Sequence, residues 1–187
     1  FYTIEKDKGQ YDNACKVFWA SGTAFLTRKS IFDTIGGFDE ILFAHMEEID
    51  YHWRCQMMGY EIWVEPSSVI FHKGAITLPT SSPMKTYLNY RNSLLLLLTN
   101  FPIKRSFFLF FPRIFFEFVS LLKEIFVLKW GHGFSIIKSW CWLIANYRII
   151  KQRRKYFNSI KGKDIDLIFQ RSIVKKYFFD RQQYYSQ

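Results

Sequence analysis

The chain has 187 residues, enough for one ordinary domain with a sizeable core. Hydrophobic residues make up 49% of it and aromatic residues 20%, which excludes an intrinsically disordered tail. The net charge of +10 is uneven: residues 1–99 hold nine Lys/Arg against eleven Asp/Glu, whereas residues 100–187 hold seventeen against five. We therefore expect the C-terminal half to face an anionic partner, with membrane headgroups and nucleic acid as the candidates.

The cysteines and the first residues bear on the setting of the chain. Cys15, Cys55 and Cys141 are odd in number, widely separated and without CxxC spacing, so they indicate neither a zinc site nor a disulfide framework. A reducing, cytoplasmic setting fits this usage best. No secretory signal opens the chain and its first residue is Phe, so we expect the sequence to begin inside a longer protein.

The first elements are a strand and a short helix. The β-prone run Lys16–Leu26 is interrupted by Ser21-Gly22, and glycine inside a strand marks a bulge or a close backbone approach. Ser30 begins a short helical segment that Gly36-Gly37 ends.

A helix is predicted from Met46 to Tyr60, followed by strands at Glu61–Val64 and Ser68–Phe71. Acidic residues crowd the first turn of this helix, where they are Glu47, Glu48 and Asp50. One explanation is compensation of the helix dipole, and the other is a catalytic base placed beside a bound hydroxyl. His45 and His52 are expected to be surface or helix-face residues.

The next helix begins at Ser82-Pro83 and ends near Asn100, before Pro102. Beyond residue 106 the character changes. Phe107–Leu122 is almost wholly apolar, although it contains a proline and two charges, Pro112, Arg113 and Glu117. We expect Gly131-His132-Gly133 to break the chain before a second apolar stretch, Phe134–Ile150.

The two apolar stretches leave three interpretations open. An in-plane amphipathic helix or shallow hairpin is favoured, because Trp140 and Trp142 precede the cationic cluster 151–155 as in an interfacial anchor. A transmembrane span and a buried packing helix are the alternatives. A spanning helix needs about 20 apolar residues, and Phe107–Leu122 is shorter.

Residues 17–74 resemble the second half of family 2 glycosyltransferases, in particular the bacterial rhamnosyltransferase-like members. The resemblance rests on an ordered set of motifs: an aromatic-x-Ser-Gly segment at 19–22, Gly-Gly-Phe-Asp-Glu at 36–40, an acidic pair followed by x-Asp and an Arg, a Gly-Tyr strand and a strand ending in His. Tyr87-Leu-Asn-Tyr90-Arg91-Asn92 is similar to the helix that follows the catalytic domain in that family.

The resemblance implies an α/β fold and an inverting sugar transfer. Residues 1–100 would form the acceptor-side, catalytic half of a GT-A (nucleotide-diphospho-sugar transferase) fold, and residues 101–187 a basic, aromatic tail of membrane-surface helices. Glu48 falls at the position of the family's catalytic base, with Glu47 as the alternative because the family more often has Glu-Asp there. Substrate contacts would come from Trp19, Ser21, Gly22 and Arg54. Arg54 and Asp50 are also expected to hold the helix and its loop in place.

The same resemblance implies a divalent metal, Mg²⁺ or Mn²⁺. His72 lies where some members supply a metal-ligating imidazole, although a histidine at a strand end is as often purely structural. The family's Asp-x-Asp metal motif does not occur in residues 1–99, and Asp164-Ile-Asp166 matches it only as letters. We therefore expect donor binding, and activity itself, to require an N-terminal half that this chain lacks.

The expected function is transfer of a sugar from a nucleotide-sugar donor to a lipid-linked or polysaccharide acceptor during cell-surface glycan synthesis. The expected location is the cytoplasmic face of the cell membrane, bound peripherally or monotopically to anionic lipid. A non-catalytic membrane-anchoring fragment remains an alternative. A nucleic-acid-binding module is disfavoured, because the aromatic residues of the tail lie in long apolar runs and no such motif is present.

Overall fold

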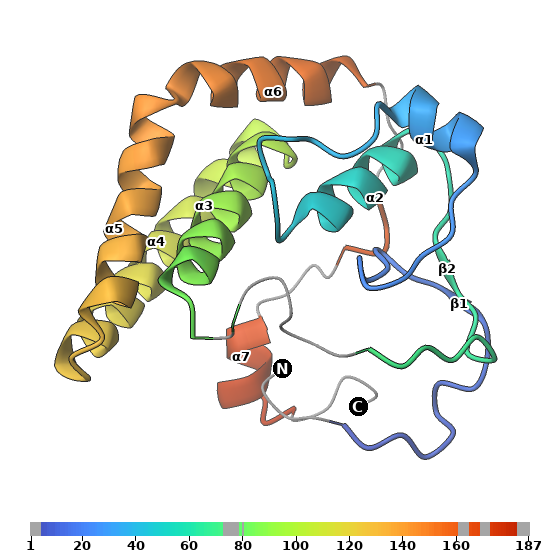
Figure 1. The fold of residues 1–187 in the computed structure, drawn as a ribbon, viewed down its shortest axis with the longest axis horizontal. Coiled ribbons are helices and arrows are strands. Elements are labelled where there is room, and N and C mark those ends of the chain that lie inside the picture. The colour runs from blue at the N-terminus through green and yellow to red at the C-terminus, as the bar shows by residue number, and fades with distance from the viewer. Residues whose placement is uncertain (1–4, 73–78, 80, 161–164, 169–172, 183–187) are drawn as a thin grey trace.

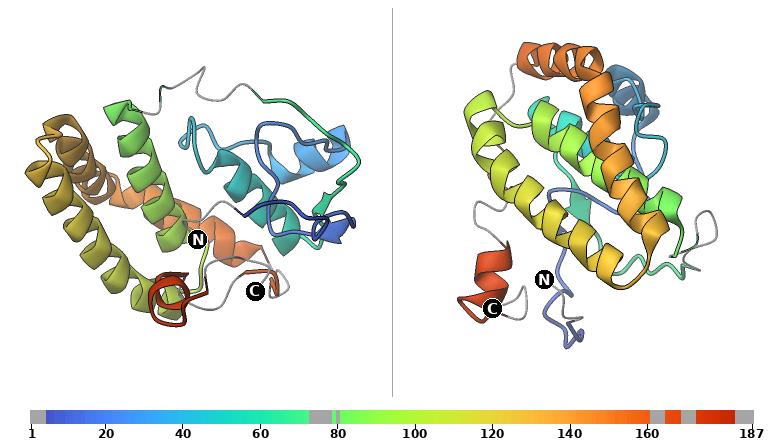
Figure 2. Two further views of the ribbon diagram at one scale, coloured as in Figure 1. Left: turned by 90° about the horizontal axis from the view of Figure 1, so that it is seen from below. Right: turned by 90° about the vertical axis from the view of Figure 1, so that its left-hand side faces the viewer.

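The computed structural model describes residues 5–72, 79, 81–160, 165–168 and 173–182, and it is mainly helical (Figure 1). Its elements are β1 (Cys15–Lys16), α1 (Lys29–Ile35), α2 (Glu47–Met57), β2 (Trp63–Val64), α3 (Pro83–Thr99), α4 (Ile103–Phe126), α5 (Trp130–Ala145), α6 (Tyr147–Ser159) and α7 (Ile173–Phe178). The bundle of α3, α4 and α5 lies on one side, and β1 and β2 lie on the other (Figures 1 and 2).

The strands are shorter than the sequence predicts. β1 and β2 form one antiparallel ladder with Cys15 opposite Val64 and Lys16 opposite Trp63. Residues 17–26 and 68–71, predicted as strands, are neither strand nor helix. A strand needs a neighbour to satisfy its backbone groups, and no further strand lies in the described residues to supply one. The α/β fold expected of a complete domain stays a prediction.

The first two helices follow the sequence pattern closely. α1 ends at Gly36, whose φ of 84° is a left-handed conformation that glycine adopts without a steric penalty. α2 lies within the predicted range 46–60. Ile35 on α1 packs with Tyr51 and Cys55 on α2 in a small core, to which Phe25 and Ile62 also contribute.

The C-terminal helices form the second core. Leu94, Leu95 and Leu96 of α3 pack with Leu143 of α5 and with Leu42, which lies in the loop before α2. α3 also contacts α4 and α6. The predicted division at residue 100 therefore falls in the short turn between α3 and α4, and α3 packs on the helices beyond it.

The break between the two apolar stretches lies slightly earlier than predicted. α4 ends at Phe126 and α5 begins at Trp130, so Gly131–Gly133 lies inside α5 and the prediction of a break there is wrong. The turn falls where Leu128 adopts a positive φ of 55°. Gly133 faces α4, since a Cβ added there would lie 3.4 Å from Leu121. Gly133 therefore allows α5 to approach α4 closely, whereas Gly131 faces Pro83 at the start of α3.

α4 exposes aromatic side chains along one face and buries a charged residue, Glu117, on the other, while Lys104 and Lys123 stay exposed. Exposed aromatics cover its outer face, at Phe107, Phe108, Phe111, Phe115 and Phe118. Glu117 is 2% exposed, and its two oxygens accept hydrogen bonds from Arg113 Nε and Trp140 Nε1, both at 2.6 Å. None of the helices within the described residues combines the length and hydrophobicity needed to cross a bilayer.

Candidate active site

The predicted acidic cluster lies at the start of α2. Glu47, Glu48 and Asp50 occupy the first turn, and Met46 is the N-cap residue but makes no side-chain capping bond. Carboxylates are stabilised there by the positive end of the helix dipole, by about 0.3–1 kcal/mol each. The helix dipole stabilises all three carboxylates in the same way. Any difference between them must therefore come from their hydrogen-bond partners.

Glu47 and Glu48 each have a carboxylate oxygen, Oε2 in both cases, that is shielded from solvent and has no hydrogen-bond partner. Burial raises the pKa of Glu47, and the neighbouring charge of Glu48 adds to this effect. An oxygen without a partner costs free energy unless another group, such as a substrate hydroxyl, approaches it. The pair therefore has the unused hydrogen-bonding capacity that a base needs.

Gly22 lies against Glu48, although the two are distant in sequence. A Cβ placed on Gly22 would be 3.6–3.7 Å from three carbon atoms of the Glu48 side chain, which is ordinary van der Waals contact. The structure thus brings the Ser-Gly segment and the predicted base together. A methyl group would fit there in ordinary contact with Glu48, so the glycine is not needed to avoid a clash.

The other residues of the predicted aromatic-Ser-Gly segment are more exposed. Trp19 is 41% exposed. The Ser21 hydroxyl donates to Thr23 Oγ1 at 3.0 Å and accepts from the Thr23 amide at 3.3 Å, which closes a local turn. Both residues are near the Gly22 position in sequence and available to a ligand.

His72 is exposed and lies at the end of a described stretch. Within the described residues no group of three or more His, Cys, Asp or Glu side chains converges as metal ligands. The residues present therefore do not make a metal site by themselves, and His72 could supply at most one ligand.

Asp50, in contrast with the two glutamates, is fully paired. It is 0% exposed; its Oδ2 accepts from Arg54 Nε at 2.9 Å, and its Oδ1 accepts from Asn100 Nδ2 at 3.1 Å and Arg153 Nη2 at 2.7 Å. Burial raises the pKa of Asp50, while the Arg54 charge opposes the rise. This carboxylate has no capacity left for a substrate.

Arg54 faces the interior rather than a ligand. Its Nη1 donates to the Ile35 carbonyl at 2.7 Å and its Nη2 to the Gly37 carbonyl at 2.8 Å, so it joins the end of α1 to α2. The structure thus places this predicted substrate contact in the scaffold of α2, in agreement with the expectation that it holds the helix and loop.

The sequence did not single out Arg153, which completes this network from α6. Arg153 bonds to Asp39 and to Asp50 and is 8% exposed, and burial lowers its pKa to about 10. The prediction that the cluster 151–155 faces lipid is wrong for Arg153, because its side chain is buried against Asp39 and Asp50 while the lysines of the cluster are exposed. No local sequence pattern indicates that Arg153 pairs with Asp39.

The two histidines near the cluster differ in environment. His52 is 3% exposed and lies in α2, so of its expected surface or helix-face position only the surface alternative is wrong. Its ring packs edge-on against the Phe25 ring, with 4.9 Å between the ring centres. Burial lowers the pKa of His52, against the effect of the Glu48 backbone. His45 is half-buried, and burial and the charge of Lys85 lower its pKa while Glu48 raises it. Its Nε2 has no partner.

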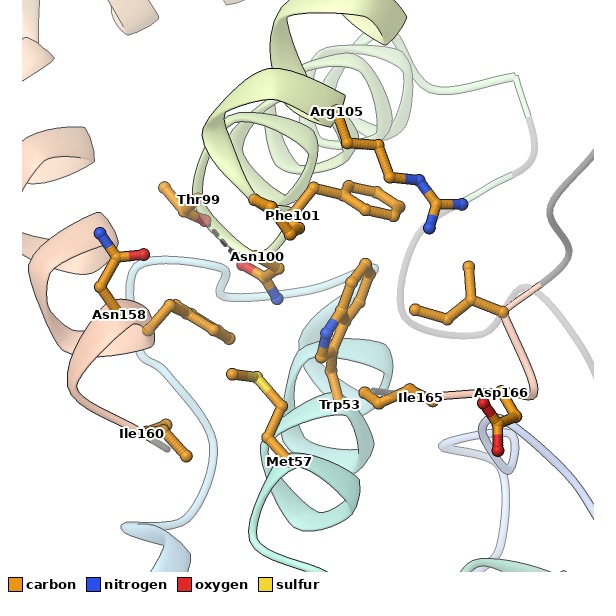
Figure 3. A pocket seen from close by; sticks show the side chains of 13 residues that line it. Trp53, Met57, Thr99, Asn100, Phe101, Arg105, Asn158, Ile160, Ile165 and Asp166 are labelled. Carbon is orange, nitrogen blue, oxygen red and sulfur yellow. Dashed lines mark hydrogen bonds between the residues drawn. The ribbon is translucent and has the colours of Figure 1, made fainter. Parts of the chain in front are cut away.

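A cavity of about 580 Å³ lies at the other end of α2 (Figure 3). Trp53, Met57, Phe101 and Arg105 are among its lining residues, and the Trp53 and Phe101 rings meet edge-on at 4.7 Å. Neither glutamate of the first turn lines it. The hollow is therefore separate from the carboxylates that could do chemistry.

Comparison with known proteins gives partial matches to rhamnosyltransferases. Over 62 residues the chain is 39% identical to the N-acetylglucosaminyl-diphospho-decaprenol L-rhamnosyltransferase of Mycobacterium tuberculosis strain CDC 1551 / Oshkosh, and equally to that of strain ATCC 25618 / H37Rv. The match covers 33% of this chain and only 20% of the length of these relatives. No protein-family model and no solved structure matches the chain. The identity supports a glycosyltransferase-like relationship at a coarse level.

Proposed function

We propose that the chain forms the acceptor-side part of an inverting glycosyltransferase of the family 2, GT-A type, with Glu48 as its base. The observation that carries the proposal is the unpartnered, shielded carboxylate oxygen of Glu48, whose side chain lies against Gly22. The partial identity to rhamnosyltransferases supports the same reaction class.

The chemistry needs one carboxylate at this place. Glu48 accepts the proton of the acceptor hydroxyl, the freed oxygen forms a bond to the anomeric carbon of the donor sugar, and the bond from that carbon to the nucleotide diphosphate breaks on the opposite face. Inversion follows because attack and departure occur on opposite sides. Glu47 is the second candidate, because burial raises its pKa toward the range in which a carboxylate is an effective base.

The donor and the metal require residues beyond those described here. Nucleotide-sugar binding and Mg²⁺ or Mn²⁺ ligation are assigned to an Asp-x-Asp half in a longer polypeptide, with His72 as one further ligand. The acceptor is proposed to be a lipid-linked glycan, as the name of the matched enzymes states for those proteins. The proton transfer above uses only Glu48 and the acceptor.

The outer face of α4 and α5 is proposed to lie on an anionic membrane. Exposed aromatics of α4 continue into Phe126, Leu128 and Trp130 at the turn, and a contiguous exposed apolar surface marks an interaction site. The same helices and the turn between them also carry exposed lysines, at positions 104, 123, 129 and 138. Aromatic side chains with basic residues nearby are the composition of an interfacial anchor, and each basic residue contributes about 1 kcal/mol near anionic lipid.

Sugar transfer tests the base. In membranes holding the longer polypeptide, transfer of L-rhamnose from a nucleotide donor to N-acetylglucosaminyl-diphospho-decaprenol is measured for wild type, Glu48→Gln, Glu47→Gln and Glu40→Gln. Glu48→Gln should lower kcat by about 10²–10⁴-fold, while Glu40→Gln, an exposed carboxylate outside the first turn, should not. Normal transfer by Glu48→Gln with loss in Glu47→Gln would move the base by one residue. Normal transfer by both Glu48→Gln and Glu47→Gln would mean that the acidic cluster only compensates the helix dipole.

Vesicle flotation tests the membrane surface separately. The chain should float with phosphatidylglycerol-containing vesicles more than with pure phosphatidylcholine. The triple variant Phe108→Ser/Phe111→Ser/Phe115→Ser should lose this binding, whereas Phe71→Ser, which removes one aromatic that is 97% exposed elsewhere, should keep it. Equal flotation of the triple variant, or a change only in its oligomeric state, would show that the face packs on protein instead.

A further inference from the structure

The loop before α2 has a strained backbone. Phe43, His45 and Met46 all have positive φ values, of 57°, 66° and 73°, and none of them is glycine. A left-handed conformation costs an L-residue about 1–2 kcal/mol. Three such residues within four positions persist only where surrounding contacts enforce them, and they stand directly before Glu47.

Asn92 of α3 supplies most of those contacts. Its side chain is 0% exposed, and its Nδ2 donates to the carbonyls of Leu42 at 2.8 Å, Ala44 at 2.9 Å and His45 at 2.6 Å. One amide group, whose two hydrogens are shared among the three acceptors, therefore gathers three carbonyls of the loop around itself. No aspartate could do this, because a carboxylate offers no donor to those carbonyls.

Arg91 holds the same loop from the adjacent position. Its Nη2 donates to the Ile41 carbonyl at 2.7 Å and the Leu42 carbonyl at 3.2 Å, and its Nε donates to Asn92 Oδ1 at 2.8 Å. Its guanidinium also lies 4.9 Å from the ring centre of Trp142 on α5. The bond to Asn92 fixes which end of the amide faces the loop, so the two side chains act together.

We propose that Arg91 and Asn92 are positioning residues for sugar transfer: they hold the loop 41–46, whose backbone is left-handed at Phe43, His45 and Met46, so that Glu47 and Glu48 are aimed at the substrate. This rests on the proposed function. The helix that carries the base can move only if its preceding loop relaxes, and the loop is tied at four carbonyls to a helix that is itself buried between α4, α5 and α6. α3 thus preorganises the strained loop together with the loop's own backbone bonds, such as those from the Leu42 and Phe43 amides to the Asp39 and Glu40 carbonyls.

Kinetics of the longer polypeptide separate positioning from general stability. Asn92→Ala should lower kcat at least 10-fold with the KM for the nucleotide donor changed less than about twofold, because truncation frees the loop without touching the donor. Leu88→Ala is the control, since it truncates another fully buried side chain of α3. At a temperature where both variants are folded, Leu88→Ala should keep kcat within about threefold.

Rescue by glycine is the second measurement. Phe43→Gly removes the steric cost of a positive φ at a residue that is 70% exposed. Added to Asn92→Ala, it should restore kcat at least threefold, and Leu26→Gly, at an exposed position outside the loop, should not. Full activity of Asn92→Ala, or a loss equal to that of Leu88→Ala without glycine rescue, overturns the inference while Glu48→Gln is still inactive. If Glu48→Gln is active, the proposed base has failed instead.

Discussion

The first turn of α2 contains two kinds of carboxylate. Glu47 and Glu48 have shielded oxygens without partners and follow a strained loop, whereas Asp50, two residues later, has both oxygens bonded to Arg54, Asn100 and Arg153. They share a helix end, a charge and a dipole. The difference comes from the hydrogen-bond partners of Asp50, because Asn100 and Arg153 lie 50 and 103 positions away in the sequence. The same acidic pattern therefore contains both a structural carboxylate and a candidate reaction centre.

The largest effect on stability is expected from removing Asp50. Asp50→Ala leaves the Arg54 and Arg153 guanidinium groups buried without their shared carboxylate, and breaking a buried pair in this way costs about 3–5 kcal/mol. Urea unfolding followed by circular dichroism measures it. Asp33→Ala is the control, because its pair with Lys29 is exposed and should change stability by less than about 1 kcal/mol. Equal losses for the two variants would mean that the network does not stabilise the fold.

A smaller loss is expected when the network is cut from α6. Arg153→Met removes the bonds to Asp39 and Asp50 but leaves Asp50 paired with Arg54, so we expect about 2 kcal/mol. A double-mutant cycle with Asp39→Asn should give a coupling energy of about 0.5–3 kcal/mol. Additive losses would show that Arg153 stabilises the protein through packing alone.

The same contrast explains what the sequence could predict. Helices α1, α2 and α3 follow from local signals, namely Gly36-Gly37, apolar periodicity and Ser82-Pro83, and the structure confirms them. The burial of Arg153 and His52 depends on contacts between distant segments, which no local pattern encodes. The predicted strands are shortened for a related reason, since strand pairing needs a partner from elsewhere and only Lys16, Trp63 and Val64 among the predicted strand residues are paired. The glutamates were singled out correctly as a cluster, but the pairing that separates Asp50 from them required the fold.

The backbone strain in the loop before α2 can be tested by relieving it at Phe43. Phe43→Gly should stabilise the protein by about 0.5–1 kcal/mol, because the left-handed penalty exceeds the entropy that glycine adds to the unfolded chain. Thermal unfolding measures the change. Leu26→Gly, also exposed but without a positive φ, should instead destabilise by about 0.5–1 kcal/mol. Destabilisation by Phe43→Gly would mean that the loop stores no strain at this residue.

The smallest effect is expected in the pH dependence of stability, and it tests whether Glu47 is as poorly compensated as its environment indicates. Burial raises the pKa of Glu47 above its ordinary value of 4.5, so the folded state holds this proton more tightly than the unfolded state. The resulting stability is complete below that value and is lost as the pH rises through the folded pKa. Glu47→Gln cannot ionise, so its stability relative to wild type should increase between pH 4.5 and pH 7.5. Glu65→Gln gives the opposite sign in a lower pH range, because hydrogen bonds from Ser67 lower the pKa of Glu65 below 4.5 and its stabilisation is lost as the pH falls through that folded pKa. If Glu47→Gln runs parallel to wild type between pH 4.5 and pH 7.5, the Glu47 carboxylate is solvated, and the contrast with Asp50 would rest on Glu48 alone.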